Sequence, residues 1–217
     1  GGSVLFKDKL RATTLNINSG TLQMGDGSAV TAAATPDLSV TNVSIGSNAK
    51  LIFNRVDNHT NSSVISGAGS FIKTGSGTTI LTGNNTYSGT TTINDGTLQI
   101  GNDTSTGSLG TGAVINNSLL DFKRSANTLV TNGITGTGDL SATLSAGGIK
   151  FAGNIALDGD VDINAANATN WSGIQLSANL FAGGDIQLTG ASTNQHGVIV
   201  DAFKTIADQQ QLKYDLR

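Results

Sequence analysis

The sequence predicts an all-β fold of the solenoid type, from a composition of turn and strand residues, short alternating strands, and internal repeats. Gly alone contributes 29 residues, Thr, Ser and Asn are abundant, and all 15 acidic residues are Asp. Asp favours turns whereas Glu favours helices, so a chain without Glu is biased away from helix. Short strands joined by many turns are the expected outcome.

Composition also narrows the classes of partner and scaffold. The formal net charge is −3 and no basic run occurs, which argues against nucleic acid and anionic membranes as partners. The absence of Cys excludes a disulfide scaffold. No apolar run is long enough to span a membrane, and residues Gly1–Leu10 are too short and charged for a signal peptide. We therefore expect that a leader was removed or that the segment comes from a longer chain.

Alternation of apolar and polar residues with period two marks strands that have one buried and one solvated face. In residues 97–101 (TLQIG), this pattern predicts Leu98 and Ile100 inside and Thr97 and Gln99 outside. In residues 157–164 (LDGDVDIN), the predicted inward positions are Leu157, Gly159, Val161 and Ile163.

Two pairs of segments repeat along the chain. Ile17–Gly25 and Ile93–Gly101 share seven of nine residues, 76 positions apart, and Ile65–Asn84 resembles Ile134–Asn154 at an offset of 69. Unequal offsets indicate several coils of unequal length, stacked so that only neighbours touch. With roughly 20 residues in a coil, as in known parallel β-helices, residues 1–200 would form about ten coils.

The tail, residues 201–217, differs from the rest of the chain. It has no Gly and spaces Phe203, Ile206, Ala207 and Gln210 at helical intervals. We therefore expect a short helix or a frayed end there.

The segment Gly67–Asn102 resembles the passenger-associated repeat of bacterial autotransporter adhesins. The positions that match the family pattern are Gly67, Gly69, Lys73, Gly75, Gly77, Leu81, Gly83, Asn85, Thr86, Tyr87, Gly89, Thr91, Ile93, Gly96 and Leu98, while Phe71 and Ile80 replace two leucines. The C-terminal part, in particular Phe181–Val200, resembles the filamentous-haemagglutinin-like and high-molecular-weight adhesins of two-partner secretion.

Both resemblances imply a right-handed parallel β-helix, threaded through an outer-membrane translocation barrel and displayed on the bacterial cell surface. They bring no catalytic residues and no cofactor. We therefore expect a secreted, non-enzymatic adhesin segment whose partner is a host cell-surface protein, matrix, glycan or another copy of itself. Two alternatives stay open: a structural stalk that promotes secretion without a ligand, and a β-helical polysaccharide-degrading enzyme.

The side chains that such an enzyme would need are scattered along the sequence. Asp121, Lys123 and Arg124 form the one compact mixed-charge group, which we interpret as a solvated salt-bridge cluster. His59 and His196 fall in polar segments that are predicted to be solvated loops. The chain has neither a thiol nor a Gly-x-Ser-x-Gly nucleophile.

One candidate metal site follows from the alternation in residues 157–164. Asp158, Asp160 and Asp162 are predicted to project from one face of a strand. Three carboxylates so placed are a candidate Ca²⁺ site, because Ca²⁺ prefers oxygen ligands, and a solvated acidic face is the alternative. The glycines of Gly67–Gly77 are assigned to coil corners rather than to a phosphate site.

Eight Asn-x-Ser/Thr sequons are candidate glycosylation sites, although chance explains several in so polar a chain. They are Asn42, Asn58, Asn61, Asn84, Asn102, Asn116, Asn167 and Asn170. The resemblance to the high-molecular-weight adhesins implies that such sites carry glycans.

Overall fold

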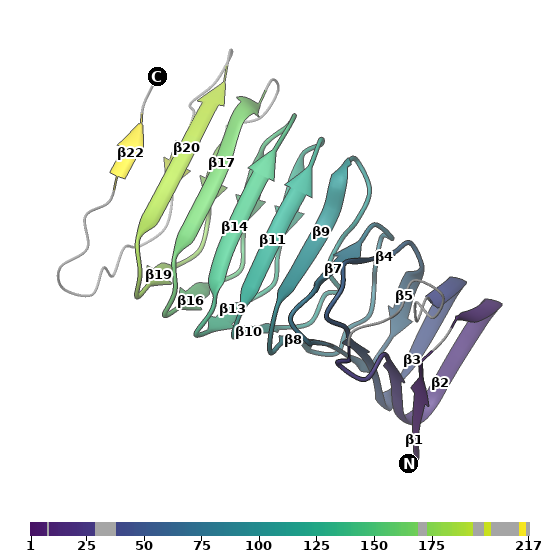
Figure 1. Ribbon diagram of the computed structural model, residues 1–217. Coiled ribbons are helices and arrows are strands. Elements are labelled where there is room, and N and C mark those ends of the chain that lie inside the picture. The colour runs from purple at the N-terminus through teal and green to yellow at the C-terminus, as the bar shows by residue number, and fades with distance from the viewer. Residues whose placement is uncertain (8, 29–37, 169–172, 193–197, 201–212, 216–217) are drawn as a thin grey trace.

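The computed structural model describes residues 1–7, 9–28, 38–168, 173–192, 198–200 and 213–215. All regular structure in these residues is β-strand, and the strands pair in parallel within three sheets that form an elongated stack (Figure 1). The described residues include no helix of the length and hydrophobicity that crossing a membrane requires. The parallel pairing confirms the predicted β-helix.

The strands of the three sheets follow one another along the stack. The first sheet contains β1 (Ser3–Phe6), β2 (Leu10–Met24), β3 (Leu38–Asn54), β5 (Val64–Gly67), β6 (Ser70–Thr74), β8 (Thr91–Ile93), β10 (Val114–Asn116), β13 (Ile134–Gly136), β16 (Ile155–Leu157) and β19 (Leu180–Ala182). The second sheet contains β4 (His59–Asn61), β7 (Thr78–Leu81), β9 (Thr97–Thr104), β11 (Leu119–Arg124), β14 (Asp139–Leu144), β17 (Val161–Ala168), β20 (Ile186–Ser192) and β22 (Lys213–Asp215). The third sheet contains β12 (Thr128–Val130), β15 (Ile149–Phe151), β18 (Ile174–Leu176) and β21 (Val198–Val200).

From β10 onward, each coil has three sides, with one strand in each sheet. Val114 pairs with Ile134 and Ile134 pairs with Ile155, so successive coils are 20 and 21 residues long. The stack has about eight coils rather than the predicted ten. Several coils are longer than 20 residues: 25 residues separate Ile155 from its partner Leu180.

The tail contributes a strand where it is described. β22 pairs in parallel with β20, so residues 213–215 are not part of the predicted helix. Residues 201–212 and 216–217, where the rest of that helix was expected, lie outside the described residues.

Columns of apolar side chains fill the interior of the stack. Leu98 and Ile100 of β9 are buried, as the alternation predicts. Gln99, predicted to be outside, is also buried, and its Nε2 donates a hydrogen bond to the Gly101 carbonyl at 2.8 Å. A side chain that turns back to its own backbone needs no solvent, which the alternation alone cannot reveal.

The nine-residue repeat forms the same local structure twice. Gln23 Nε2 donates to the Gly25 carbonyl at 2.8 Å, just as Gln99 does to Gly101, and both glycines have φ of +81°. One copy ends β2 in the first sheet, while the other runs from the end of β8 in the first sheet into β9 of the second sheet. The two copies therefore share a local backbone turn and its hydrogen bond, but they occur at different positions around the coil.

A row of rings fills the core beside the matched repeat. The centroid of Phe53 lies 5.3 Å from that of His59, and Phe71 lies 5.6 Å from Phe53 and 6.0 Å from Tyr87. Tyr87 is completely buried, and its hydroxyl lies 2.7 Å from Thr91 Oγ1. The prediction that His59 lies in a solvated loop is wrong, because His59 begins β4 and its ring stacks on the core.

Neighbouring corners approach so closely that only glycine fits at several of them. A Cβ on Gly89 would lie 2.1 Å from the Gly69 carbonyl oxygen, and a Cβ on Gly112 would lie 2.2 Å from that of Gly89. Gly75 adds a positive φ of +78° at another corner. The corner role predicted for the glycines of the repeat is therefore confirmed.

Lys73 is buried, and its ammonium group joins two successive corners. Its Nζ donates to the carbonyls of Thr74 at 3.0 Å, Gly75, and Asp95 of the next coil at 3.1 Å. Burial lowers the pKa of Lys73 to about 8, and the Asp95 carboxylate opposes that shift.

The contact at Gly89 predicts that Gly89→Ala destabilises the protein. The added methyl group meets a backbone oxygen that cannot move without separating two coils, so we expect a loss of about 2 kcal/mol in the free energy of unfolding. Gly133→Ala is the matched control, because a Cβ there would lie 4.0 Å from the nearest atom, Asn154 O. Urea denaturation of the two variants measures the difference, and equal midpoints would contradict the steric argument.

The buried ammonium of Lys73 predicts that stability rises between pH 8 and pH 10. In this window the folded protein releases the Lys73 proton while the unfolded chain, with the ordinary pKa of 10.5, retains it, so higher pH favours folding. Above pH 10 the trend should reverse, because burial raises the pKa of Tyr87 to about 12 and the unfolded phenol ionises first. Urea denaturation across this range tests both the rise in stability below pH 10 and the fall above it. Lys73→Met should remove only the rise.

Candidate functional site

The regular stacking is interrupted where β9 carries extra residues. Phe122 of β11 pairs with Ile100, but Arg124 pairs with Thr104, so β9 contains two residues that β11 does not match. Asp103, within this bulge, has φ of +54°, a left-handed conformation that few residues other than glycine adopt. A bulge of this kind bends its strand locally and leaves the extra residues unpaired.

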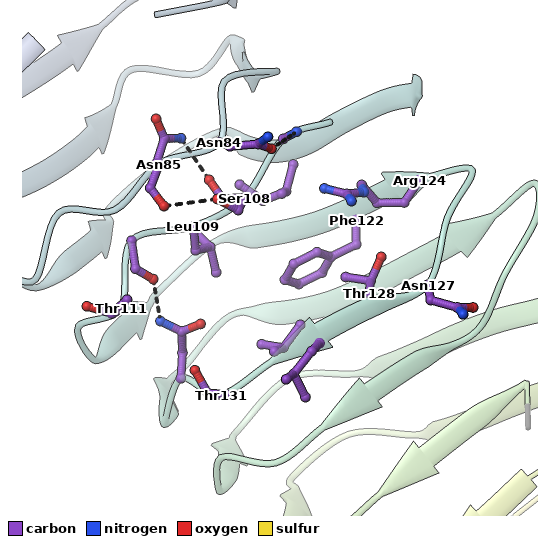
Figure 2. Close-up of a pocket in the computed structure, with 16 residues that line it drawn as sticks. Asn84, Asn85, Ser108, Leu109, Thr111, Phe122, Arg124, Asn127, Thr128 and Thr131 are labelled. Carbon is purple, nitrogen blue, oxygen red and sulfur yellow. Dashed lines mark hydrogen bonds between the residues drawn. The ribbon is translucent and has the colours of Figure 1, made fainter. Parts of the chain in front are cut away.

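A groove of about 340 Å³ lies between this bulged coil and the next one (Figure 2). It is lined by residues 84–85, 107–111 and 127–132, together with Ile100, Phe122 and Arg124. Residues 107–111 form no strand of the third sheet, which starts one coil later with β12. The groove therefore occupies the place where backbone pairing between the two coils is missing.

The groove has an apolar floor and a polar rim. The buried apolar side chains are Ile100, Leu109, Phe122 and Val130. The exposed polar side chains are Asn84, Thr111, Asn127 and Thr131. This combination is typical of sites for small amphipathic ligands.

Side-chain hydrogen bonds bridge the two coils at the ends of the groove. At one end, Arg124 Nη2 donates to the Ser105 carbonyl at 2.8 Å. At the other end, Asn132 Nδ2 donates to the carbonyls of Gly110 at 2.9 Å and Gly112 at 2.6 Å. These bridges replace the missing backbone ladder and limit the length of the groove.

Between the bridges, the free edge of the third sheet faces the groove. The backbone N–H of Thr128 and the carbonyl of Val130 bond to Gly148 and Ala152 of the following coil, at 2.9 and 2.8 Å. In a parallel strand the backbone groups of the intervening residue point the other way. The N–H and C=O of Leu129 are therefore directed into the groove, and its side chain is 57% exposed.

Two rim asparagines use their side-chain oxygens to hold backbone groups. Asn84 Oδ1 accepts from the Gly107 N–H at 3.1 Å, and Asn127 Oδ1 accepts from the Gly148 N–H at 3.0 Å. Each arrangement fixes the orientation of the amide and leaves its NH₂ group as a donor at the rim.

The predicted mixed-charge cluster is divided between the two faces of β11. Asp121 and Lys123 share the face away from the interior, with 3.7 Å between Oδ2 and Nζ. Burial raises the pKa of Asp121, and Lys123 opposes the shift. Arg124 lies on the opposite face, buried beside the groove. The prediction of one solvated cluster is therefore wrong: Asp121 and Arg124 are both buried, and they lie on opposite faces because successive residues of a strand point in opposite directions.

Asp158, Asp160 and Asp162 do not share one strand. Asp158 and Asp160 lie in the corner between β16 and β17, Asp162 lies within β17, and all three are exposed. No three His, Cys, Asp or Glu side chains in the described part of the chain are placed to hold a metal ion together. Leu157, Val161 and Ile163 are buried, as the alternation predicts, but the prediction of one strand face is wrong because the chain turns at the corner between β16 and β17.

Asp160 instead belongs to a ladder of aspartates at successive corners. Asp139 Oδ1 accepts from the backbone N–H of Asp160 at 2.8 Å, and Asp160 Oδ1 accepts from that of Asp185 at 2.7 Å. Each carboxylate thus satisfies a backbone donor of the next coil, which explains why Asp recurs at these corners.

The eight sequons divide by accessibility. The exposed ones are Asn42, Asn58, Asn84 and Asn102. Asn61 and Asn116 are 1% and 0% exposed, and Asn116 Nδ2 donates to the Asp139 carbonyl at 2.7 Å, so this fold accommodates a glycan at neither position. The side chain of Asn167, together with Asn170 and His196, lies outside the described residues.

Comparison with known proteins identifies the repeat that adjoins the groove. The profile of the Passenger-associated-transport-repeat family matches residues 71–100, so the chain contains an autotransporter passenger repeat. Over 74 residues the chain is also 46% identical to the Adhesin BmaC autotransporter of Brucella suis biovar 1 (strain 1330). That match covers 34% of this chain and 2% of the adhesin's length. No solved structure matches the chain significantly.

The characteristic positions of the repeat serve the fold, whereas the groove lies mostly beyond it. Lys73 and Gly89 lie at corners between coils, and Tyr87 is buried in the core. None of these three residues lines the groove. The groove was missed in the sequence because its walls come from two coils. Its one visible signal is the polar insertion Asn102–Ser108 directly after the repeat.

The aspartate ladder predicts a small, metal-independent effect at Asp160. Asp160→Ala removes the acceptor for the Asp185 N–H and should lower the free energy of unfolding by about 1 kcal/mol, whereas Asp160→Asn keeps an acceptor and should lose less. Thermal melting with excess Ca²⁺ and with excess chelator should give the same midpoint. A midpoint that falls with chelator, and no longer falls in Asp160→Ala, would instead support the Ca²⁺ site.

Proposed function

We propose that the chain is a non-enzymatic segment of a surface-exported bacterial adhesin, secreted through an outer-membrane barrel. The observation that carries the proposal is the passenger repeat at residues 71–100, together with a match to an autotransporter adhesin over 74 residues of the chain. The stack supports it physically, because each coil touches only its neighbours and displays a polar outer surface suited to extended contacts. The partner would be a host protein, matrix or glycan, or a second copy of the chain.

The groove favours binding over hydrolysis. Glycoside hydrolysis uses two carboxylates that flank the scissile bond. The residues that line the groove include no Asp or Glu, and Asp121 lies on the other face of β11. We therefore assign the groove to recognition.

A structural stalk that promotes secretion is the second candidate, and the repeat itself favours it. Lys73, Tyr87 and Gly89 stabilise coils without presenting side chains to a ligand. Such a segment would lengthen the exported rod and help it to fold, while adhesion would come from elsewhere in the parent protein.

Deleting this segment from its parent protein distinguishes the two candidates. We expect the bacteria to lose adhesion per surface copy, with adhesion counted on host cells and surface copies counted by antibody labelling. The control removes only residues 134–154, one complete coil whose loss puts Ile155 in the place of Ile134 and removes none of the residues that line the groove. A full deletion that lowers the surface copy number but leaves adhesion per copy unchanged would overturn the adhesive role in favour of the stalk.

A further inference from the structure

The described residues contain two buried guanidinium groups, and only one has a carboxylate partner. Arg55, 3% exposed, donates from Nε and Nη2 to the two carboxylate oxygens of Asp57, at 3.0 and 2.5 Å. Arg124, 8% exposed, forms no ion pair within the described residues. The two arginines are therefore buried in different chemical environments.

Most of the hydrogen-bonding capacity of Arg124 is unused. A guanidinium carries five N–H donors. In the part of the chain that the structure describes, Arg124 donates one hydrogen bond, from Nη2 to Ser105, and its buried Nε has no acceptor. Burial lowers the pKa of Arg124, yet arginine stays charged. A buried cation without a partner is costly, and an anion would offset that cost.

Arg124 belongs to the wall of the groove. Figure 2 shows its guanidinium end on the side of Asn84 and Ser108, above the ring of Phe122. The backbone groups of Leu129 and the rim amide of Asn127 add both donors and an acceptor. A ligand whose anionic group lies beside Arg124 would therefore also carry groups that donate and accept hydrogen bonds.

The shape and chemistry of the groove fit a saccharide unit. A sugar ring offers hydroxyl groups to the polar rim and C–H groups to the apolar floor, and 340 Å³ is within the range of small-ligand sites. An extended peptide added to the free edge of β12 would need room beyond both ends of the strand. The bridges from Arg124 to Ser105 and from Asn132 to Gly110 close those ends.

We propose that this groove binds an acidic saccharide, with Arg124 receiving its anionic group and the edge of β12 and the rim asparagines receiving its hydroxyl groups. The proposal rests on the adhesive function proposed above and names the class of ligand. The anionic group is a carboxylate or a sulfate, both of which match the planar fork of a guanidinium.

Binding of defined oligosaccharides to the purified 217-residue chain tests the proposal by calorimetry. The probes are sialyllactose, which carries a carboxylate, a heparin-derived tetrasaccharide, which carries sulfates as well, and neutral lactose. At least one acidic probe should bind about tenfold or more tightly than lactose, as expected for one charge-assisted hydrogen-bonded contact. Comparison of the two acidic probes separates the carboxylate from the sulfate.

Arg124→Met should weaken binding of the acidic probe by about tenfold or more. Lys123→Met is its matched control, because it removes the same charge from the next residue of β11 on the other face. The control should leave the affinity within about twofold, since an exposed charge is screened by salt.

A second pair of variants keeps the test valid if Arg124→Met does not fold. Asn127→Asp retains the Oδ1 that accepts from Gly148 but brings a negative charge to the rim, so it should weaken binding of the acidic probe severalfold more than binding of lactose. Asn154→Asp is the control: its Oδ1 accepts from Asn179 in the same way at 3.2 Å, away from the groove, and it should have no effect.

Three results would overturn the proposal: equal affinity for lactose and the acidic probes, equal effects of Asn127→Asp and Asn154→Asp, or inorganic phosphate that binds as tightly as the saccharides. If the purified chain binds no probe while deletion of the segment still lowers adhesion, this inference fails and the adhesive function stands. If the acidic probe binds but deletion leaves adhesion unchanged, the site is real and the adhesive function fails.

Discussion

Parallel stacking of coils at a fixed separation of about 4.8 Å is the constraint on which the whole structure depends. Each strand must present its backbone groups to the coil before and the coil after, so every coil has to repeat the path of its neighbour. The corners obey the same rule: Gly89 fits against Gly69, and Asp160 accepts the hydrogen bond that the next corner offers. The polar residues of this chain are as much a part of that geometry as its apolar columns.

The groove shows what happens where two coils differ in length. The extra residues of β9 cannot pair, the third sheet loses a strand, and side chains such as Arg124 and Asn132 bridge the gap. The energetic cost is local, because only the adjoining coils are affected. Regular coils therefore supply the stability of the stack, and an irregular coil creates the groove.

Much of the fold could be predicted from the sequence because strands and corners leave local patterns, as Leu98 and Ile100 illustrate. The errors arise where the chain turns at a corner or where a polar side chain is buried, as Gln99 and His59 are. The corner at Asp158–Asp160 separates side chains that the alternation placed on one face, and Gln99 is buried although the alternation placed it outside. The groove could not be predicted, since its walls are brought together only by stacking.

The coil-by-coil pairing also has a mechanical consequence for a protein held by one end. A pulling force applied along the chain acts on the terminal coil first, because interior coils are held on both sides. The coil from Ile134 to the residue before Ile155 contains 21 residues, so a terminal coil of that length would release roughly 70 Å of extended chain on detaching. The remaining coils keep their contacts, so the stack would lengthen in steps and absorb load without losing its fold at once.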